Sequence, residues 1–457
     1  MGGVPRLCRG SRGQGLKMGR IQLRRFKACF AALSIMVVTT TVGAAAITNA
    51  PAGAAAKDTT PIVVGGDGDL SISAGVTQGF EAGIYRFNKA GGLDGRKIEY
   101  LGFLDDAFSP ATNLSNAQEL VNSKHVFAIA PFVGQSAGAG TGTFLAQNKV
   151  PFLGWSTNAA FDTQPKWGFG INGNQGNPAV QGAGGMIQLI AAEGDQAHPS
   201  KIKMALIAND LSGAIIANKA LAGVATDEGI NVVYQKAVIA AVGTTNYAPY
   251  AQAMMAAGAN TVYEVLGATD SVGVAAALHA AGFKGLIVNG VTYYQGDLAA
   301  QGASEEQALQ GVYVEDEFPA NQDSGPAVTQ GEKDLVATGQ NSGMTSGTAV
   351  GYWTAIVFEQ MLKATLARVG GNPAKVTGAA LQQTVAGGKS YSYTDPIADG
   401  IGTETFPAAE TLPTGCGTLV KTVGTGFKLI EPYKCYYDIN ISTGAHLNPL
   451  TGKTEAK

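Results

Sequence analysis

The chain has 457 residues, of which 45% are hydrophobic and 14% are charged, so it is long enough for two folded domains and too apolar to be disordered. Residues 1–56 carry eight of the 31 basic side chains and no acidic one, which leaves 23 basic against 34 acidic side chains, a balance of −11, in the remainder. This acidic balance argues against nucleic acid as a partner.

The first 56 residues have the three parts of a secretory signal peptide. The basic stretch is followed by an apolar run at residues 28–42, which is short for a membrane span, and then by small residues at 43–56. We therefore expect this segment to be removed during export, and the mature chain to be secreted or to lie in the periplasm or cell envelope. A retained membrane anchor is the alternative.

A strand, a polar loop, a helix and a second strand are expected between residues 61 and 104. Residues 61–65 form a short apolar run that ends in glycine, which is typical of a buried parallel strand. Residues 67–75 are rich in Gly, Ser and Asp and follow that strand at its carboxyl end, where ligands bind in open α/β sheets. Apolar residues at helical spacing begin near residue 78, and residues 98–104 form the next strand.

Strand and helix patterns then alternate up to about residue 177, and a second such series begins near residue 178. Alternation with short connections predicts parallel sheets with helices on both faces. The two series therefore predict an α/β protein with two doubly wound parallel-sheet lobes. The alternation of strand and helix patterns ends near residue 396. Further on, two apolar runs on either side of Gly424 indicate a β-hairpin.

Two of the four cysteines, Cys416 and Cys435, remain after removal of the expected signal peptide. An even pair in an oxidising compartment predicts a disulfide, and two free buried thiols are the alternative. The disulfide would clamp the C-terminal hairpin. Closing a loop of about twenty residues would contribute roughly 3 kcal/mol in the chain-entropy model.

One motif resembles the opening of the type I periplasmic binding proteins, the branched-chain amino acid receptors of ABC importers. The pattern N-x-x-G-G-[IL]-x-G-[RK] is matched by Asn88, Gly91, Gly92, Leu93, Gly95 and Arg96. The resemblance, which runs from about residue 61 to 385, implies two lobes joined by a three-segment hinge, with a solute in the cleft between them. It divides the chain into lobe 1, residues 57–177 and 296–395, and lobe 2, residues 178–295 and 396–457.

The resemblance implies that a serine in the loop of residues 134–138 binds the solute's carboxylate through its hydroxyl and nearby N–H groups. Ser136 is the serine that we assign to this role, with Gln135 beside it. The alternative role of Ser136 is to cap the following helix.

A second loop of the family holds the same carboxylate through a threonine. Thr157 matches that position, and Trp155 and Ser156 stand where backbone and wall contacts are usual in the family. Trp155 could instead belong to the core.

Lobe 2 departs from the resembled amino acid receptors in two places. They carry a tyrosine in the loop where this chain has Ser212, and a glutamate for the ligand's ammonium near residues 289–293, where this chain has no acidic residue. One of three other acids would have to replace that glutamate: Asp210, Glu264 or Asp270.

The alternative is a ligand without an ammonium group. An ammonium buried without a carboxylate would cost several kcal/mol. The sequence therefore slightly favours a carboxylate or amide ligand with an apolar or aromatic body, with Tyr293 and Trp155 as walls.

Residues 134–138, GQSAG, also fit G-x-S-x-G, the nucleophile elbow of α/β hydrolases. A secreted esterase that uses Ser136 is therefore the alternative function. Against it, no glycine-rich oxyanion segment precedes the serine, and none of the four histidines stands in an obvious strand-end loop: His125, His198, His279 and His446. We expect a binding protein and no enzyme.

The mature sequence has no complete dinucleotide fingerprint, phosphate loop or Cys/His metal spacing. We therefore expect no cofactor and no metal ion. The expected partners are a small-molecule solute and the membrane subunits of an ABC permease, and we expect a monomer.

Overall fold

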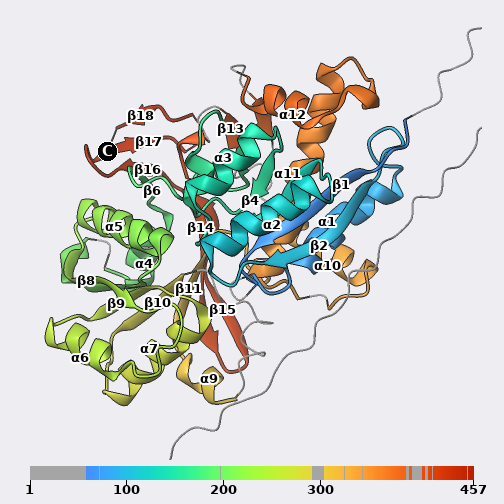
Figure 1. The fold of residues 1–457 in the computed structure, drawn as a ribbon. Coiled ribbons are helices and arrows are strands. Elements are labelled where there is room, and N and C mark those ends of the chain that lie inside the picture. The colour runs from blue at the N-terminus through green and yellow to red at the C-terminus, as the bar shows by residue number, and fades with distance from the viewer. Residues whose placement is uncertain are drawn as a thin grey trace, which may run out of the picture. The chain divides into compact units, whose positions relative to one another are not determined.

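A computed structural model describes residues 58–70, 73–195, 197–290, 303–323, 325–341, 343–387, 391–393, 404–406, 410–413, 415–449 and 451–456. These residues contain two large β-sheets with helices on both faces (Figure 1). The α/β architecture predicted from the alternating sequence pattern is confirmed. The expected signal peptide lies outside the described residues.

The first sheet contains five parallel strands in the order β2-β1-β3-β4-β5. The strands are β1 (Ile62–Gly68), β2 (Ile98–Asp105), β3 (Ala128–Val133), β4 (Phe152–Gly154) and β5 (Gly168–Gly170). A separate hydrophobic core lies on each face of this sheet. Residues of α2 (Pro110–Asn122) and α3 (Ala139–Gln147) contribute to one core, and the other includes residues of α1 (Val76–Lys89), α10 (Pro326–Ala337), α11 (Ser346–Arg368) and α12 (Gly378–Val385).

Helices α1 and α11 approach each other through glycines. A Cβ atom on Gly79 of α1 would collide with the carbonyl oxygen of Thr348, and one on Gly351 of α11 would collide with that of Val76. The backbones can pack this closely only because these positions lack side chains. Helix α11 begins at a capping box formed by Thr345 and Thr348.

The second sheet contains seven strands in the order β15-β14-β11-β10-β9-β7-β8. Five are parallel, and β14 pairs antiparallel with both β11 and β15. The strands are β7 (Lys203–Asn209), β8 (Asn231–Ile239), β9 (Thr261–Val265), β10 (Leu286–Gly290), β11 (Tyr313–Asp316), β14 (Cys416–Val423) and β15 (Gly426–Cys435). The core on one face includes α4 (Gly184–Glu193) and α5 (Ser212–Asp227), and the core on the other includes α6 (Ala248–Ala256) and α7 (Ala268–Ala280).

Strands β14 and β15 form the predicted C-terminal hairpin. Cys416 and Cys435 stand opposite each other in its register and are joined by the predicted disulfide, with their Cα atoms 3.9 Å apart. The hairpin extends the second sheet, so its placement with lobe 2 agrees with the strand pairing.

The predicted lobe boundaries need two corrections. Strand β11 was assigned to lobe 1, but it pairs in parallel with β10 and belongs to the second sheet. Strand β13 (Glu404–Phe406) was assigned to lobe 2, but Phe406 is buried in the core of the first sheet against Phe169. The rest of the division stays a prediction.

The remaining elements are short. Strand β12 (Tyr391–Tyr393) pairs with β13, and a four-stranded antiparallel sheet has the order β18-β17-β16-β6. Its members are β6 (Val180–Gly182), β16 (Asp438–Asn440), β17 (Ala445–Leu447) and β18 (Thr454–Glu455). The other helices are α9 (Ala303–Ala308) and the 3₁₀ turns η1 (Ala159–Asp162), η2 (Pro199–Lys201) and η3 (Pro373–Lys375).

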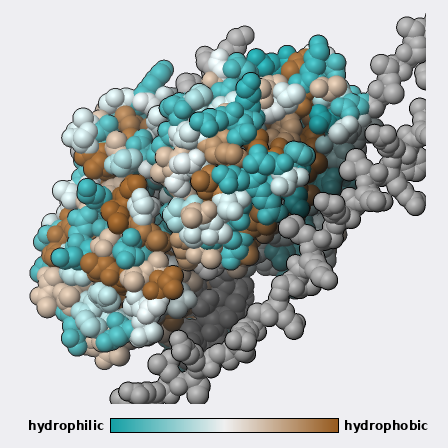
Figure 2. All heavy atoms as spheres, viewed as in Figure 1, coloured by the Kyte–Doolittle hydropathy of each residue, from teal (hydrophilic) through white to brown (hydrophobic). Residues whose placement is uncertain are grey.

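The surface alternates between hydrophilic and hydrophobic residues over the part that carries α5, α6 and α7 (Figure 2). Exposed apolar side chains there include Ile215 on α5, Val238 on β8 and the nearby Val242. Within the described part of the chain, we find no helix with the length and hydropathy of a membrane span.

Candidate functional site

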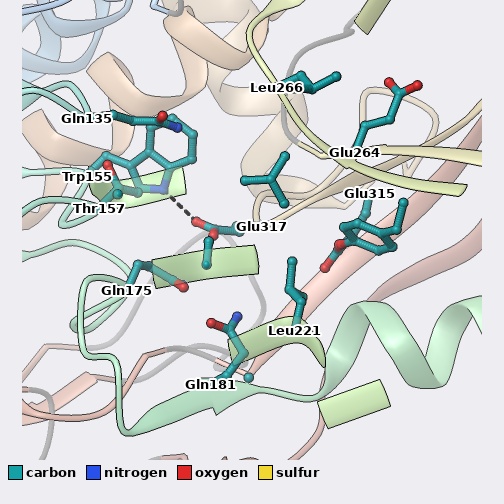
Figure 3. Close-up of a pocket in the computed structure, with 15 residues that line it drawn as sticks. Gln135, Trp155, Thr157, Gln175, Gln181, Leu221, Glu264, Leu266, Glu315 and Glu317 are labelled. Carbon is teal, nitrogen blue, oxygen red and sulfur yellow. Dashed lines mark hydrogen bonds between the residues drawn. The ribbon is translucent and has the colours of Figure 1, made fainter. Parts of the chain in front are cut away.

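A cavity of about 120 Å³ lies at the carboxyl ends of strands from both large sheets (Figure 3). The first sheet contributes the loops after β3 and β4, with Gln135, Trp155 and Thr157. The second contributes the ends of β9 and β11 and the first turns of α5. The loops of a parallel α/β sheet meet at this edge, which is where ligands bind in such folds.

The two loops from the first sheet are tied together at one carbonyl group. The oxygen of Gly134 accepts a hydrogen bond of 2.8 Å from the Asn158 amide and a longer one of 3.4 Å from the Thr157 hydroxyl. This anchor brings Gln135 and Thr157 to the same wall of the cavity, where the sequence analysis expected them.

Two predicted serines do not line the cavity. The Ser136 hydroxyl donates to the Asp106 carboxylate at 2.8 Å, and Asn113 donates to the same carboxylate oxygen at 3.0 Å. The Ser156 hydroxyl is buried, donates to the carbonyl oxygen of Gly173 and accepts a 3.1 Å hydrogen bond from the N–H group of Gln175. Both hydroxyls therefore hold loops in place in this structure.

The predicted contacts of lobe 2 are also displaced. Ser212 is exposed at the start of α5, and the next residue, Gly213, lines the cavity instead. A Cβ atom on Gly213 would lie 2.7 Å from the carbonyl oxygen of Thr157, so glycine permits α5 to approach this loop. Tyr293 lies outside the described residues.

Glu264 lies on β9 at the cavity, but its carboxyl group points away from Glu317 (Figure 3). Side chains alternate along a strand, so Tyr263 packs on the α4 and α5 face while Glu264 faces α7, beside Ser271. Burial raises the pKa of Glu264 well above its ordinary value.

The other two acids proposed for an ammonium, Asp210 and Asp270, are not among the residues that line the cavity. Asp210 is exposed and accepts a hydrogen bond from the N–H group of Ala241. Asp270 accepts hydrogen bonds of 2.7 Å from the Asn209 amide and 2.8 Å from the Tyr247 hydroxyl.

Two acids that the sequence analysis did not select do line the cavity, Glu315 and Glu317. They stand two residues apart at the end of β11, so strand alternation places both on one face. Oε2 of Glu317 accepts a 2.7 Å hydrogen bond from Nε1 of Trp155 and a second one from the Asn172 amide. Burial raises the pKa of Glu317 to about 7, although both hydrogen bonds act to lower it.

Glu315 lies against the first turn of α4. A Cβ atom on Gly185 would collide with the Glu315 carboxyl group, so the glycine leaves room for it. Burial raises the pKa of Glu315 to about 8, and the nearby charge of Glu317 adds to the increase. The sequence signal for this pair was a run of three acids, residues 315–317, directly after an apolar strand.

The arrangement around Ser136 does not match a hydrolase. The side-chain partner of Ser136 is Asp106. His198 contacts Asp195 and His446 contacts Asp227, while His125 and His279 are exposed. Within the described ranges, no cluster of three or more His, Cys, Asp or Glu side chains is placed to hold a metal ion.

Two doubly wound sheets with a shared cavity at their strand ends define a bilobed α/β protein of the solute-binding class. Residues 62–425 match the model of the family described as periplasmic binding protein. Because this match spans most of its length, the chain belongs to that family, as the glycine motif predicted. A search of curated protein sequences gave no match.

Solved structures of ABC transporter solute-binding proteins share the fold. One from R. palustris in complex with 4-hydroxybenzoate has a TM-score of 0.63 and 22% identity, over 82% of this chain and 97% of that one. A branched-chain amino acid ABC transporter protein from Thermus thermophilus with bound valine has a TM-score of 0.63 and 14% identity, over 82% of this chain and 97% of that one. A fatty acid ABC transporter substrate-binding protein from Thermomonospora curvata has a TM-score of 0.64 and 16% identity, over 87% of this chain and 96% of that one.

Proposed function

We propose that this chain is the extracytoplasmic receptor of an ABC importer, and that its solute binds in the cavity lined by Trp155, Thr157 and Glu317. The observation that supports this assignment most directly is that loops from both sheets line one cavity in a member of the binding protein family. A ligand enclosed in this way can be shielded from water on both sides.

In this proposal the loops of the first sheet offer hydrogen-bonding groups to the solute. The Gln135 side-chain amide can donate or accept a hydrogen bond. The Thr157 hydroxyl makes a long hydrogen bond of 3.4 Å to the Gly134 carbonyl oxygen, which a hydrogen bond to the solute could replace. Trp155 supplies an aromatic wall. The R. palustris and Thermus thermophilus proteins named above hold 4-hydroxybenzoate and valine, which are small solutes of the size class that this assignment requires.

The protein releases its solute unaltered to the permease. In this proposal residues 1–56 direct export and are removed, the mature chain acts as a monomer, and the lobes close on the solute by a hinge motion. Ser136 has no catalytic role, because its hydroxyl is held by Asp106.

A thermal-shift screen of the mature chain tests this function. Amines, amides, amino acids and aromatic acids should be compared, because a ligand that binds only the folded state raises the melting temperature. Saturable stabilisation by one solute class, without turnover of that solute, is the expected result. Hydrolysis of an ester that is lost in Ser136→Ala would instead favour an enzyme.

A further inference from the structure

The cavity has an unusual charge balance for a site that accepts a small solute. Its described lining residues include three glutamates, Glu264, Glu315 and Glu317, and none of these described lining residues is lysine, arginine or histidine. A carboxylate solute would add a further negative charge without a basic side chain to balance it.

Among the residues that the structure describes, hydrogen-bond donors reach one of the four carboxyl oxygens of the pair Glu315 and Glu317. Both donors to Glu317, the Trp155 indole and the Asn172 amide, bind the same oxygen, Oε2. Among the described residues, no group donates to Oε1 of Glu317 or to Glu315. Three acceptor oxygens of two lining residues therefore have no donor in the described part of the chain.

Two neighbouring carboxylates in a partly dehydrated site are unstable unless protons or a cation neutralise them. Protons can supply this neutralisation, because burial and the nearby charge of Glu317 raise the pKa of Glu315 to about 8. A ligand that brings its own positive charge and several N–H donors would replace those protons and satisfy the free oxygens. The aromatic ring of Trp155 is a further favourable neighbour for a cation.

We propose that the solute carries a positively charged nitrogen group, an amine or an amidine, that binds to Glu315 and Glu317 at the end of β11. This inference rests on the proposed function of the cavity. It replaces the sequence-based preference for an ammonium-free ligand, and it places the acids on a different strand from residues 289–293, where the resembled receptors carry their glutamate.

Isothermal titration calorimetry with three probes of one shape tests the charge preference. Benzylamine, benzamide and benzoate share an aromatic body and differ in charge, and each is titrated at about pH 8, where Glu317 is largely ionised. We expect benzylamine to bind at least tenfold more tightly than the other two, a difference of about 1.4 kcal/mol.

The variants Glu315→Gln and Glu317→Gln identify the groups responsible. Glutamine keeps an oxygen for the Trp155 and Asn172 donors, so each variant should fold, which its melting temperature checks. Each should lose about tenfold or more in benzylamine affinity and little in benzamide affinity. Glu119→Gln on α2, where the carboxyl group is half exposed, is the matched control and should change neither.

Tighter binding of benzoate than benzylamine, or unchanged benzylamine affinity in both glutamine variants, would overturn the cation assignment. In the first case the cavity would still bind a solute, and the proposed function would stand. If no probe binds at concentrations up to about 20 mM, the cation assignment is wrong, and the wider thermal-shift screen decides the proposed function separately.

Discussion

Nε1 of Trp155 donates a hydrogen bond of 2.7 Å to Oε2 of Glu317. The bond joins the loop after β4, in the first sheet, to the end of β11, in the second. It therefore connects the two halves of the protein through a residue that also lines the cavity. Its removal should affect both stability and the protonation of the site.

Trp155→Phe should lower the free energy of unfolding by roughly 1.5–3 kcal/mol, because Glu317 loses a donor to its buried carboxyl group. The pKa of Glu317 should rise further, since this hydrogen bond acts to lower it. Urea denaturation measures the first effect, and carboxyl ¹³C NMR titration measures the second.

Trp353→Phe is the matched control for that substitution. The indole of Trp353 is also buried, but its N–H group has no hydrogen-bond partner among the described residues. The control should therefore leave the pKa of Glu317 unchanged. An equal change in this pKa in both variants would show that the Trp155 hydrogen bond is not the cause.

The unliganded protein should lose stability as the pH rises from about 5 to about 8. Burial raises the pKa of Glu317 to about 7 and that of Glu315 to about 8, whereas an unfolded glutamate has a pKa of about 4.3. The folded state thus holds these protons more tightly, and the stability they provide is lost as pH rises through the folded-state pKa values.

Melting temperatures across this pH range measure the effect. The double variant Glu315→Gln/Glu317→Gln should have a flatter profile than the unsubstituted protein. Some slope should remain, because burial also raises the pKa of Asp67 to about 8. Superimposable profiles would contradict the assignment of this pH dependence to the glutamate pair.

Thr157→Ala should weaken binding of the screened solute by roughly 1–3 kcal/mol while leaving the fold intact, because it removes a hydroxyl that lines the cavity. Calorimetry gives the affinity, and the melting temperature checks the fold. Thr226→Ala on α5, whose hydroxyl bonds to the Ala222 carbonyl within the helix, is the control. Equal affinity for the unsubstituted protein and Thr157→Ala would remove Thr157 from the site.

Cys416→Ser/Cys435→Ser should destabilise the protein by roughly 3 kcal/mol, the chain-entropy contribution of a loop of this length. The disulfide closes a separation of 19 residues in the hairpin that extends the second sheet. Urea denaturation of this variant and of the oxidised protein gives the difference. Reduction of the disulfide in the unsubstituted protein should lower the stability by the same amount. A variant as stable as the oxidised protein would show that the disulfide does not stabilise the hairpin.

Gly79→Ala should destabilise the protein by roughly 1–3 kcal/mol, because the new methyl group would collide with the backbone of α11. Gly140→Ala on α3 is the matched control. Nothing lies within 4 Å of its Cβ position, so it should be neutral or stabilise by up to about 1 kcal/mol through helix propensity. Denaturation curves for both variants decide whether the close helix contact is required.

Local patterns predicted the start of the fold well. The apolar run that begins at residue 61 became β1, and the glycines after residue 90 end α1 before β2 begins at Ile98. The spacing of apolar residues identifies such elements, because the apolar residues of a helix or strand mark the face or faces that it buries. It could not assign β11 to a sheet, since the choice of neighbouring strand depends on contacts between distant parts of the chain.

The site was only partly predictable for a related reason. Gln135, Trp155 and Thr157 could be placed at the cavity because they follow strands of the first sheet in matched loops, and their contact with a solute stays a prediction. The run of acids that contains Glu315 and Glu317 was visible in the sequence, but acids at a strand end usually face solvent. Only the packing of β11 beside β10, and the placement of α4, show that these two are enclosed.

The protein has three tryptophans, and all three are buried. Trp167 lies in the hydrophobic core on one face of the first sheet, and Trp155 and Trp353 lie in the core on the other face. Of the three, Trp155 also lines the cavity. The fluorescence of an indole responds to the charge beside it, and Trp155 is hydrogen-bonded to Glu317. In the proposed complex a charged ligand replaces the proton of Glu317, so the charge beside Trp155 would change on binding. The intrinsic fluorescence of Trp155 should therefore report ligand binding without an attached dye.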